Sequence, residues 1–348
     1  MSGFSADVAA QPAVIRRVVA AASGRLDGPL DAAAALIHRD PARPIAVVGM
    51  GSSLTAGRVV QAVLASAGRV VMLEDAGEFL HYGLGAASGL GCLLAVSQSG
   101  RSAETVRAVE RVRGSLPIVA VVNDAASPVA AAADVVLDVD AGVEAAVATR
   151  TYVASVAVLA LLAGRIAPDG PTPADIARAA DEMDLQLHAT DGMRGARHLA
   201  GSRALVVVGR GPGLGAADYA ALTIKESAAI PAESLSGGAF RHGPLELATA
   251  DVGFVVLAPA GATASLAAGI AREVAARGSR TWLLADAPQA GAPGDPASLL
   301  CTTLPDLPEP LAQLSCAVPL QQAADELARA AGRRAGVTIV ATKVTDVE

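Results

Sequence analysis

Two short polar segments of this chain carry the side chains best suited to bind an anion. Residues 97–102 read Ser-Gln-Ser-Gly-Arg-Ser and directly follow the apolar run at residues 92–96. A helical pattern begins near Ala103, so hydroxyls, an amide and the first backbone N–H groups of a helix should meet there. Ser52 and Ser53 follow Gly-Met-Gly after a second apolar run. Because ligands of open α/β sheets bind at the carboxyl ends of strands, these segments predict a phosphate site.

Two other interpretations of the same residues stay open. Ser99 or Ser102 could serve only as the N-cap of the following helix, which is a common place for serine. A dinucleotide site is less favoured, because residues 49–54 lack the third glycine of the usual fingerprint. The candidate phosphate-binding residues are Ser52, Ser53, Ser97, Gln98, Ser99 and Ser102.

The apolar runs that precede these loops each occur twice. Residues 45–53 recur at 204–212 and residues 93–100 recur at 254–261, in both cases about 160 residues later. A nearly constant offset indicates the tandem duplication of a whole domain. At residues 258–260 the second copy has Ala-Pro-Ala where the first has Ser-Gln-Ser. We therefore expect one anion site, with the second copy doing something else.

β-rich runs alternate with Ala-rich helical stretches along the chain, as in parallel sheets covered by helices on both faces. We expect an α/β fold with two tandem domains, each a flavodoxin-like three-layer sandwich. Helices are expected near residues 11–19, 152–162, 174–198 and 319–331. Strands are expected near residues 45–49, 70–73, 92–96, 118–122, 135–137, 204–209, 252–257, 281–284 and 299–302.

A linker separates the two expected domains. Three prolines and a glycine at residues 167–173 forbid regular structure there. The expected parts are an N-terminal helical segment, a first domain, a linker with a connecting helix, a second domain and a C-terminal tail. Their boundaries are 1–30, 31–166, 167–198, 199–335 and 336–348.

The composition of the chain excludes several classes of protein. The net charge of -7 argues against a nucleic-acid or anionic-membrane partner. We find neither a run of eighteen uncharged apolar residues nor a signal-peptide pattern, so a cytoplasmic protein is expected. Cys92, Cys301 and Cys316 lie in apolar runs and are interpreted as buried free thiols. The five histidines are scattered, and we expect no metal and no other cofactor.

These loops and their strands resemble the sugar isomerase (SIS) family of phosphosugar-binding domains. Residues 225–227, 232–234 and 241–245 have the mutual spacings found in the isomerase domain of glucosamine-6-phosphate synthase. Residues 341–348 resemble the end of that domain. We expect no counterpart of the synthase's amino-terminal glutaminase domain. The resemblance therefore implies stand-alone relatives, such as glucosamine-6-phosphate deaminases of the isomerase-like type.

The same resemblance implies site residues in the second half. Glu226 matches the family's general base, which moves a proton between C1 and C2 of an open-chain sugar. His242 matches the residue that opens the sugar ring. Lys343 matches a tail lysine that forms an imine or contacts the open-chain oxygens. Ala148 and Thr149 match a substrate-loop segment. The alternatives are a surface ion pair for the glutamate, a structural histidine and a free chain end.

Several positions depart from the family's pattern and bear on the exact substrate. Thr223 stands where the synthase has a second lysine, and Arg150 replaces a usual lysine. Residues 337–340 replace the Pro-Arg-Asn segment that precedes the tail lysine. Glu144 lies one residue closer to Thr149 than in the family.

The resemblance implies an enzyme that converts glucosamine 6-phosphate to fructose 6-phosphate and ammonia. Another phosphosugar isomerase or deglycase, or a non-catalytic phosphosugar sensor, are the alternatives. Sensors of this family usually carry a helix-turn-helix domain, and no basic DNA-binding segment is visible here. The expected partner is a phosphosugar substrate. In the synthase-like relatives the histidine comes from a second subunit, so the resemblance also implies a homodimer.

Overall fold

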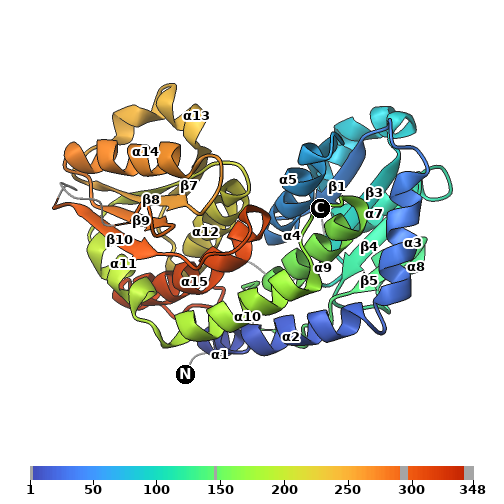
Figure 1. The fold of residues 1–348 in the computed structure, drawn as a ribbon, viewed down its shortest axis with the longest axis horizontal. Coiled ribbons are helices and arrows are strands. Elements are labelled where there is room, and N and C mark those ends of the chain that lie inside the picture. Colours follow the sequence, from blue (N-terminus) through green and yellow to red (C-terminus); the bar gives the residue numbers. More distant parts are fainter. Residues whose placement is uncertain (1–2, 145–146, 291–296, 341–348) are drawn as a thin grey trace. The chain divides into compact units, whose positions relative to one another are not determined.

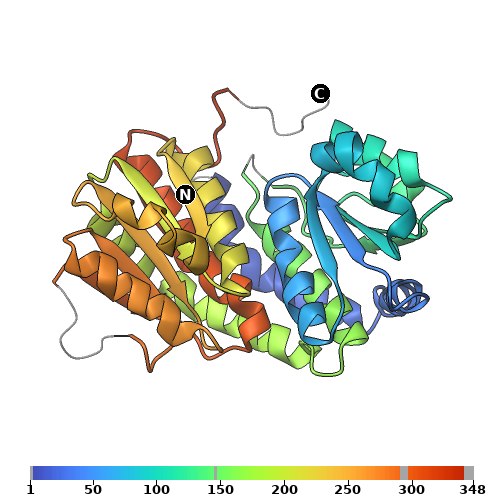
Figure 2. The same ribbon diagram turned by 90° about the horizontal axis from the view of Figure 1, so that it is seen from above.

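In the computed structural model the chain forms two compact units, each built on one parallel sheet. The structure describes residues 3–144, 147–290 and 297–340. The sheet A unit comprises residues 11–144 and 150–177. The sheet B unit comprises the described residues among 3–10, 147–149 and 178–339. Figures 1 and 2 show helices on both faces of each sheet, so the predicted α/β class is confirmed.

Sheet A has five parallel strands in the order β2-β1-β3-β4-β5, and all five were predicted. Every residue of β1, β3 and β4 is buried, because helices cover both faces of these central strands. Gly49 pairs with Val96, so the loops that follow β1 and β3 are neighbours at the carboxyl edge. The strands are β1 (Ile45–Gly49), β2 (Val71–Asp75), β3 (Cys92–Ser97), β4 (Ile118–Val122) and β5 (Val135–Asp138).

A central helix, α9, organises one side of the sheet A unit. It is buried along nearly its whole length and packs against α2, α3, α4 and α5, as expected of a helix that is apolar all round. The helices are α2 (Gln11–Ala22), α3 (Asp27–His38), α4 (Ser52–Ala56), α5 (Arg58–Ser66), α6 (Ala76–Glu78), α7 (Ala103–Val112), α8 (Pro128–Ala132) and α9 (Arg150–Ile166). A π-helical turn and a 3₁₀ turn follow α6 at Phe79–Gly83 and Leu84–Gly89.

Sheet B has the order β10-β9-β8-β6-β7, in which β6 and β8 take the places of β1 and β3. The repeated sequence runs therefore occupy equivalent strands. One strand, β7, was not predicted, because Ala232–Ser236 is short, polar and only partly buried at the sheet edge. The strands are β6 (Ala204–Gly209), β7 (Ala232–Ser236), β8 (Val252–Ala258), β9 (Thr281–Ala285) and β10 (Leu299–Thr303).

Two predicted helices differ from those in the structure. Residues 174–198 form two helices instead of one, and the late helix begins well before Pro319. Pro319 lacks the N–H that would bond the Ser315 carbonyl inside that helix. Gln186 Nε2 donates to this oxygen instead, at 2.8 Å, which explains how the helix continues through the proline.

The helices of the sheet B unit and its connection pack around two apolar clusters, one on each face of the sheet. They are α1 (Gly3–Ala9), α10 (Pro173–His188), α11 (Asp191–Leu199), α12 (Gly213–Ala228), α13 (Gly237–Arg241), α14 (Ala264–Ala276) and α15 (Ala312–Ala330). Short 3₁₀ turns lie at Pro244–Leu247 and Glu309–Leu311.

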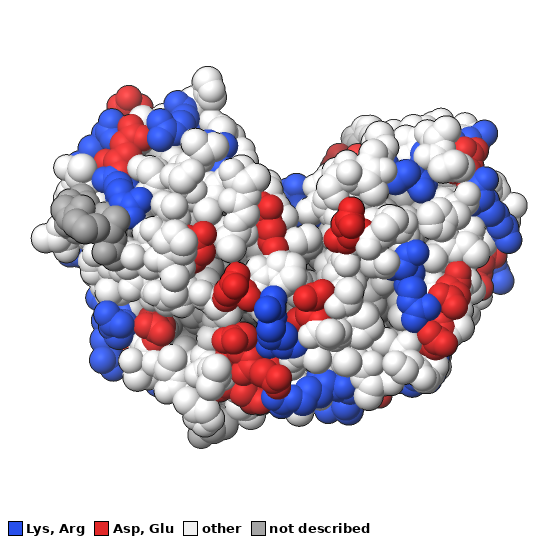
Figure 3. Space-filling model, viewed as in Figure 1, with Lys and Arg blue, Asp and Glu red and all other residues white. Residues whose placement is uncertain are grey.

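Two of the three cysteines are buried as predicted, but Cys301 on the edge strand β10 is only partly buried. Burial raises the pKa of the Cys92 and Cys316 thiols to about 12, so both stay protonated near neutral pH. Among the described helices, none is long and apolar enough to span a lipid bilayer. On the face shown in Figure 3, basic side chains lie among acidic ones rather than in one continuous patch.

Candidate functional site

The carboxyl edge of sheet A brings together three of the predicted residues. Ser52 and Ser53 begin α4, which follows β1, and Gln98 follows β3. Their side chains line one small cavity, whose remaining wall comes from α9. The α9 residues in this wall are Thr151, Tyr152 and Ser155.

The loop after β3 is shaped by its own hydrogen bonds. Ser97 Oγ accepts the N–H of Gly100 at 3.1 Å, and Ser99 Oγ accepts the N–H of Arg101 at 3.1 Å. Gly100 has a φ of 61°, in the left-handed region. A Cβ atom at this position would lie 2.0 Å from Ser127 Oγ, so the close approach of the two loops requires glycine.

Several polar groups at this edge have no hydrogen-bond partner within the part of the chain that the structure describes. They are the hydroxyls of Ser52, Ser53, Ser102 and Ser155 and the amide of Gln98. Ser102 stands at the N-cap position of α7, but its side chain makes no capping hydrogen bond there. Hydroxyls and amides donate hydrogen bonds, and together with the amino end of α7 they suit an anion.

A buried carboxylate fixes the start of α9 beside the small cavity. Glu144 is 6% exposed and accepts the backbone N–H of Thr151 at 3.1 Å as well as its hydroxyl. A carboxylate is favourable at this position because the amino end of a helix carries partial positive charge. Arg150, the first residue of α9, donates to the carbonyl of Val143, which precedes Glu144.

Sequence analysis missed the contribution of α9. Its available signal was a pair of hydroxyls, Thr151 and Ser155, spaced four apart on one face of an apolar helix. Such a pair is common in ordinary helices and does not indicate a site without the fold. Ser155 is 8% exposed and faces the same cavity as Ser53 and Gln98.

A wider cavity of about 460 Å³ adjoins this edge and shares Gln98 and Ser99 in its wall. Its other walls follow β4 and β5. Asn123 joins the two loops, since its Nδ2 donates to Gly142 O at 3.0 Å and its Oδ1 accepts the N–H of Ala141 at 2.7 Å. The volume and the polar lining suit a small polar ligand.

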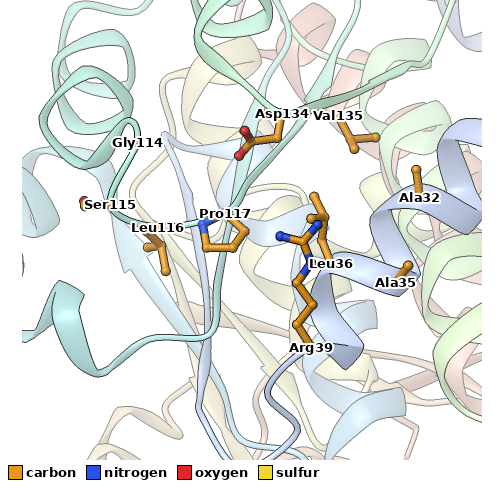
Figure 4. Close-up of a pocket in the computed structure, with 10 residues that line it drawn as sticks. All are labelled: Ala32, Ala35, Leu36, Arg39, Gly114, Ser115, Leu116, Pro117, Asp134 and Val135. Atoms are coloured by element: carbon orange, nitrogen blue, oxygen red, sulfur yellow. The ribbon is translucent and has the colours of Figure 1, made fainter.

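Another cavity, of about 670 Å³, lies at the opposite edge of sheet A and contains none of the predicted residues (Figure 4). It is lined by α3, the loop before β4 and the start of β5. Asp134 in its wall accepts the N–H of Ile118 at 2.8 Å, which supports the start of β4. Because α/β sheets bind ligands at the carboxyl edge, we do not assign the candidate site to this cavity.

The equivalent loop of sheet B is already paired with a carboxylate of the chain. After β8 this loop reads Pro-Ala-Gly, without hydroxyls. The N–H of Ala262 donates to Glu309 Oε2 at 3.3 Å. A Cβ atom on Gly261 would lie 2.1 Å from the carboxyl carbon of Glu309, so that side chain occupies the space beside the loop.

Glu226 lies near the end of α12 in the sheet B unit, and burial raises the pKa of its carboxyl to about 7. The side chain is nevertheless exposed. A water molecule can reach the carboxyl, but the protein around it displaces much of the surrounding solvent. The ionised form is therefore less well solvated than in open water, which raises the pKa. Lys225 has the smaller, opposite effect on this pKa. Among the described residues Glu226 makes no ion pair, and Lys225 acts on it through charge alone.

His242 follows α13 and lies at the carboxyl end of the strands of sheet B, whereas Glu226 lies at their amino end. The end of α12 leads into the start of β7, whereas His242 comes after the end of β7. A five-residue strand spans about 16 Å. The sheet B unit therefore does not bring these two side chains together.

Ala148 and Thr149 belong to the sheet B unit, as Glu226 does. Val147 is buried in the apolar cluster that includes residues of α12 and α15, and Thr149 is fully buried. The carbonyl of Ala148 accepts the hydroxyl of Tyr219 from α12 at 2.9 Å.

Lys343 lies outside the described residues. Within the described ranges, no group of three or more His, Cys, Asp or Glu side chains has the arrangement of a metal site.

Curated relatives of this chain are glutamine–fructose-6-phosphate aminotransferases (isomerizing). The protein of Zymomonas mobilis is 32% identical over 290 residues, which are 80% of this chain and 47% of that protein. The protein of Pyrococcus horikoshii is 33% identical over 297 residues, which are 82% of this chain and 48% of that protein. The chain thus spans about half the length of the curated relatives it matches.

Solved structures share the fold at low sequence identity. The C-terminal domain of glucosamine-fructose-6-phosphate aminotransferase from Francisella tularensis has a TM-score of 0.81 at 20% identity, covering 96% of this chain and 98% of that one. Glucosamine-6-phosphate deaminase from Thermotoga maritima has a TM-score of 0.69 at 15% identity, covering 95% and 99%. The SIS domain model matches residues 40–165 and 198–296. With two matched segments on two sheets of the same topology, the chain belongs to the SIS domain family.

Proposed function

We propose that this protein is a phosphosugar isomerase whose phosphate site lies at the carboxyl edge of sheet A. The observation that carries the proposal is the group of unpartnered donors there, because a phosphate accepts several hydrogen bonds at once. In this proposal Ser52, Ser53, Ser97, Gln98, Ser99 and Ser102 bind the phosphate. Ser155 adds a donor from α9.

The proposed chemistry is the conversion of glucosamine 6-phosphate and water to fructose 6-phosphate and ammonia. His242 opens the sugar ring by moving a proton from the C1 hydroxyl to the ring oxygen. Glu226 then removes the C2 proton and returns it to C1, while a proton of the amine passes to the C1 oxygen, so C1 becomes an alcohol and C2 an imine. Water adds to this imine, and ammonia leaves. A carboxyl with a pKa of about 7 supports the role of Glu226, since it is both base and acid near neutral pH.

The proposal also includes a homodimer in which His242 acts on the substrate of a second copy. Two points support it. Synthase-like relatives supply this histidine from a second subunit, and Glu226 and His242 lie at opposite ends of the strands of sheet B. In the same proposal Lys343 contacts the open-chain sugar.

A plain aldose-ketose isomerase or a deglycase is the second candidate, favoured by the departures at Thr223 and Arg150. The test is to incubate the protein with a panel of amino-sugar phosphates and follow both ammonia and fructose 6-phosphate. Equal amounts of the two products support the deaminase. Isomerisation of aldose or ketose phosphates that lack the amino group, assayed beside the panel, without ammonia from the amino sugars supports the second candidate. Binding without any turnover supports a sensor. Glu226→Gln should abolish turnover and leave the affinity for inorganic phosphate unchanged.

A further inference from the structure

Two buried hydrogen bonds connect the segment at residues 147–149 to the helices α12 and α15. Tyr219 Oη donates to the carbonyl of Ala148 at 2.9 Å, and Gln321 Nε2 donates to Tyr219 Oη at 2.8 Å. Tyr219 is 1% exposed and Gln321 is 0% exposed. Polar groups at such depth need hydrogen-bond partners. Gln321 is a partner of the Tyr219 hydroxyl, and this hydroxyl is a partner of the Ala148 carbonyl.

The direction of both bonds follows from their chemistry. A backbone carbonyl can only accept, so it takes the single proton of the tyrosine hydroxyl. The hydroxyl can then only accept from Gln321, which must present its NH₂ group. The pair therefore holds the Ala148 carbonyl at one place beside α12.

This place is on the side of α12 that carries Glu226. Tyr219 and Glu226 are about two turns apart, which puts them at nearly the same angle around the helix and about 10 Å apart along its axis. Val147 is buried in the apolar cluster that includes residues of α12 and α15, so burial restrains the segment from its other end. The segment and the proposed base thus share one rigid support.

We propose that Tyr219 is a positioning residue, which holds residues 147–149 where they contact the sugar beside Glu226. Gln321 donates a hydrogen bond to the tyrosine hydroxyl, whose own bond to Ala148 does not depend on it. The inference rests on the proposed function, in which Ala148 and Thr149 contact the sugar. Tyr219 itself acts through Ala148 and does not touch the substrate.

The test compares three variants of the full-length protein. Tyr219→Phe removes the hydroxyl and keeps the ring, so KM for the sugar phosphate should rise about five- to tenfold, as expected for one buried hydrogen bond. Gln321→Met leaves the bond to Ala148 in place and should change KM less than twofold, although it too lowers the melting temperature. Tyr82→Phe is the matched control, because Tyr82 is 82% exposed. The Kd for inorganic phosphate should stay the same in all three, since the phosphate residues belong to the sheet A unit.

Amide hydrogen exchange at residues 147–149 tests the anchor without any substrate. Exchange there should speed up in Tyr219→Phe and not in Tyr82→Phe. An unchanged KM in Tyr219→Phe, or equal changes of KM in Tyr219→Phe and Gln321→Met, would overturn the inference and leave the proposed function standing. A wild-type protein that turns over no sugar phosphate would overturn the proposed function, and unchanged exchange in Tyr219→Phe would overturn the anchor independently.

Discussion

The pH dependence of turnover gives the sharpest test of Glu226 as the base. Burial raises the pKa of this carboxyl to about 7, compared with an ordinary value of 4.5. Only the ionised form accepts the C2 proton, so kcat/KM should be about half its maximum at pH 7. Below about pH 6 it should fall about tenfold for each unit by which the pH is lowered. With an ordinary glutamate pKa, kcat/KM would stay unchanged as the pH is lowered to about 5.5.

A control is needed because the phosphate of the substrate and a histidine also titrate in this range. Lys225 lowers the pKa of Glu226. Removing its charge in Lys225→Gln should move the acidic limb of the profile to higher pH, whereas Lys225→Arg should leave the limb in place. Neither change alters the ionisation of the substrate phosphate. The assay is the initial rate of ammonia release, together with uptake of solvent deuterium at the sugar carbons, from about pH 5.5 to about pH 8.5.

Stability measurements separate loss of the base from loss of the fold. The raised pKa means that the folded state holds the Glu226 proton more tightly than the unfolded state. This contribution is fully present below about pH 4.5 and is lost as the pH rises through about 7. Glu226→Gln should therefore be at least as stable as the wild type at pH 8 while being inactive. A flat rate profile, or a limb that Lys225→Gln does not move, would refute the assignment.

Two further predictions concern the phosphate loop and α9. Gly100→Ala should lower the free energy of unfolding by about 3 kcal/mol in urea titrations. Two effects add: the left-handed backbone strain of a non-glycine residue, and a clash with Ser127, a buried residue that cannot move out of the core. Gly114→Ala has the same strain with open space around it and should lose only about 1 kcal/mol; equal losses would contradict the clash. Ser155→Ala should weaken inorganic phosphate binding about threefold to tenfold by calorimetry, whereas Ser115→Ala at the opposite edge should not, and unchanged affinity in the first would remove α9 from the site.

The fold could largely be predicted because its central strands are apolar on both faces. Burial by helices on two sides leaves an uninterrupted apolar run, and the three central strands of sheet A, β1, β3 and β4, were found this way. β7 was missed because an edge strand with one partner does not need such a run. The start of α15 was missed because a proline usually stands in the first turn of a helix. Here Pro319 is tolerated inside α15 because Gln186 of α10 donates to the carbonyl that the proline leaves without its helical partner.

The sequence by itself determined the two-domain α/β fold, the duplication and the positions of the polar loops, since each is a local pattern of residue types. Tertiary structure alone decided which side chains meet. It brought Ser155 of α9 to the cavity of Ser53 and Gln98, and it attached the Ala148 carbonyl to Tyr219. It also put Glu309 beside the second loop. These contacts join residues far apart in the chain, and their existence depends on how helices pack on a sheet, which no local pattern encodes.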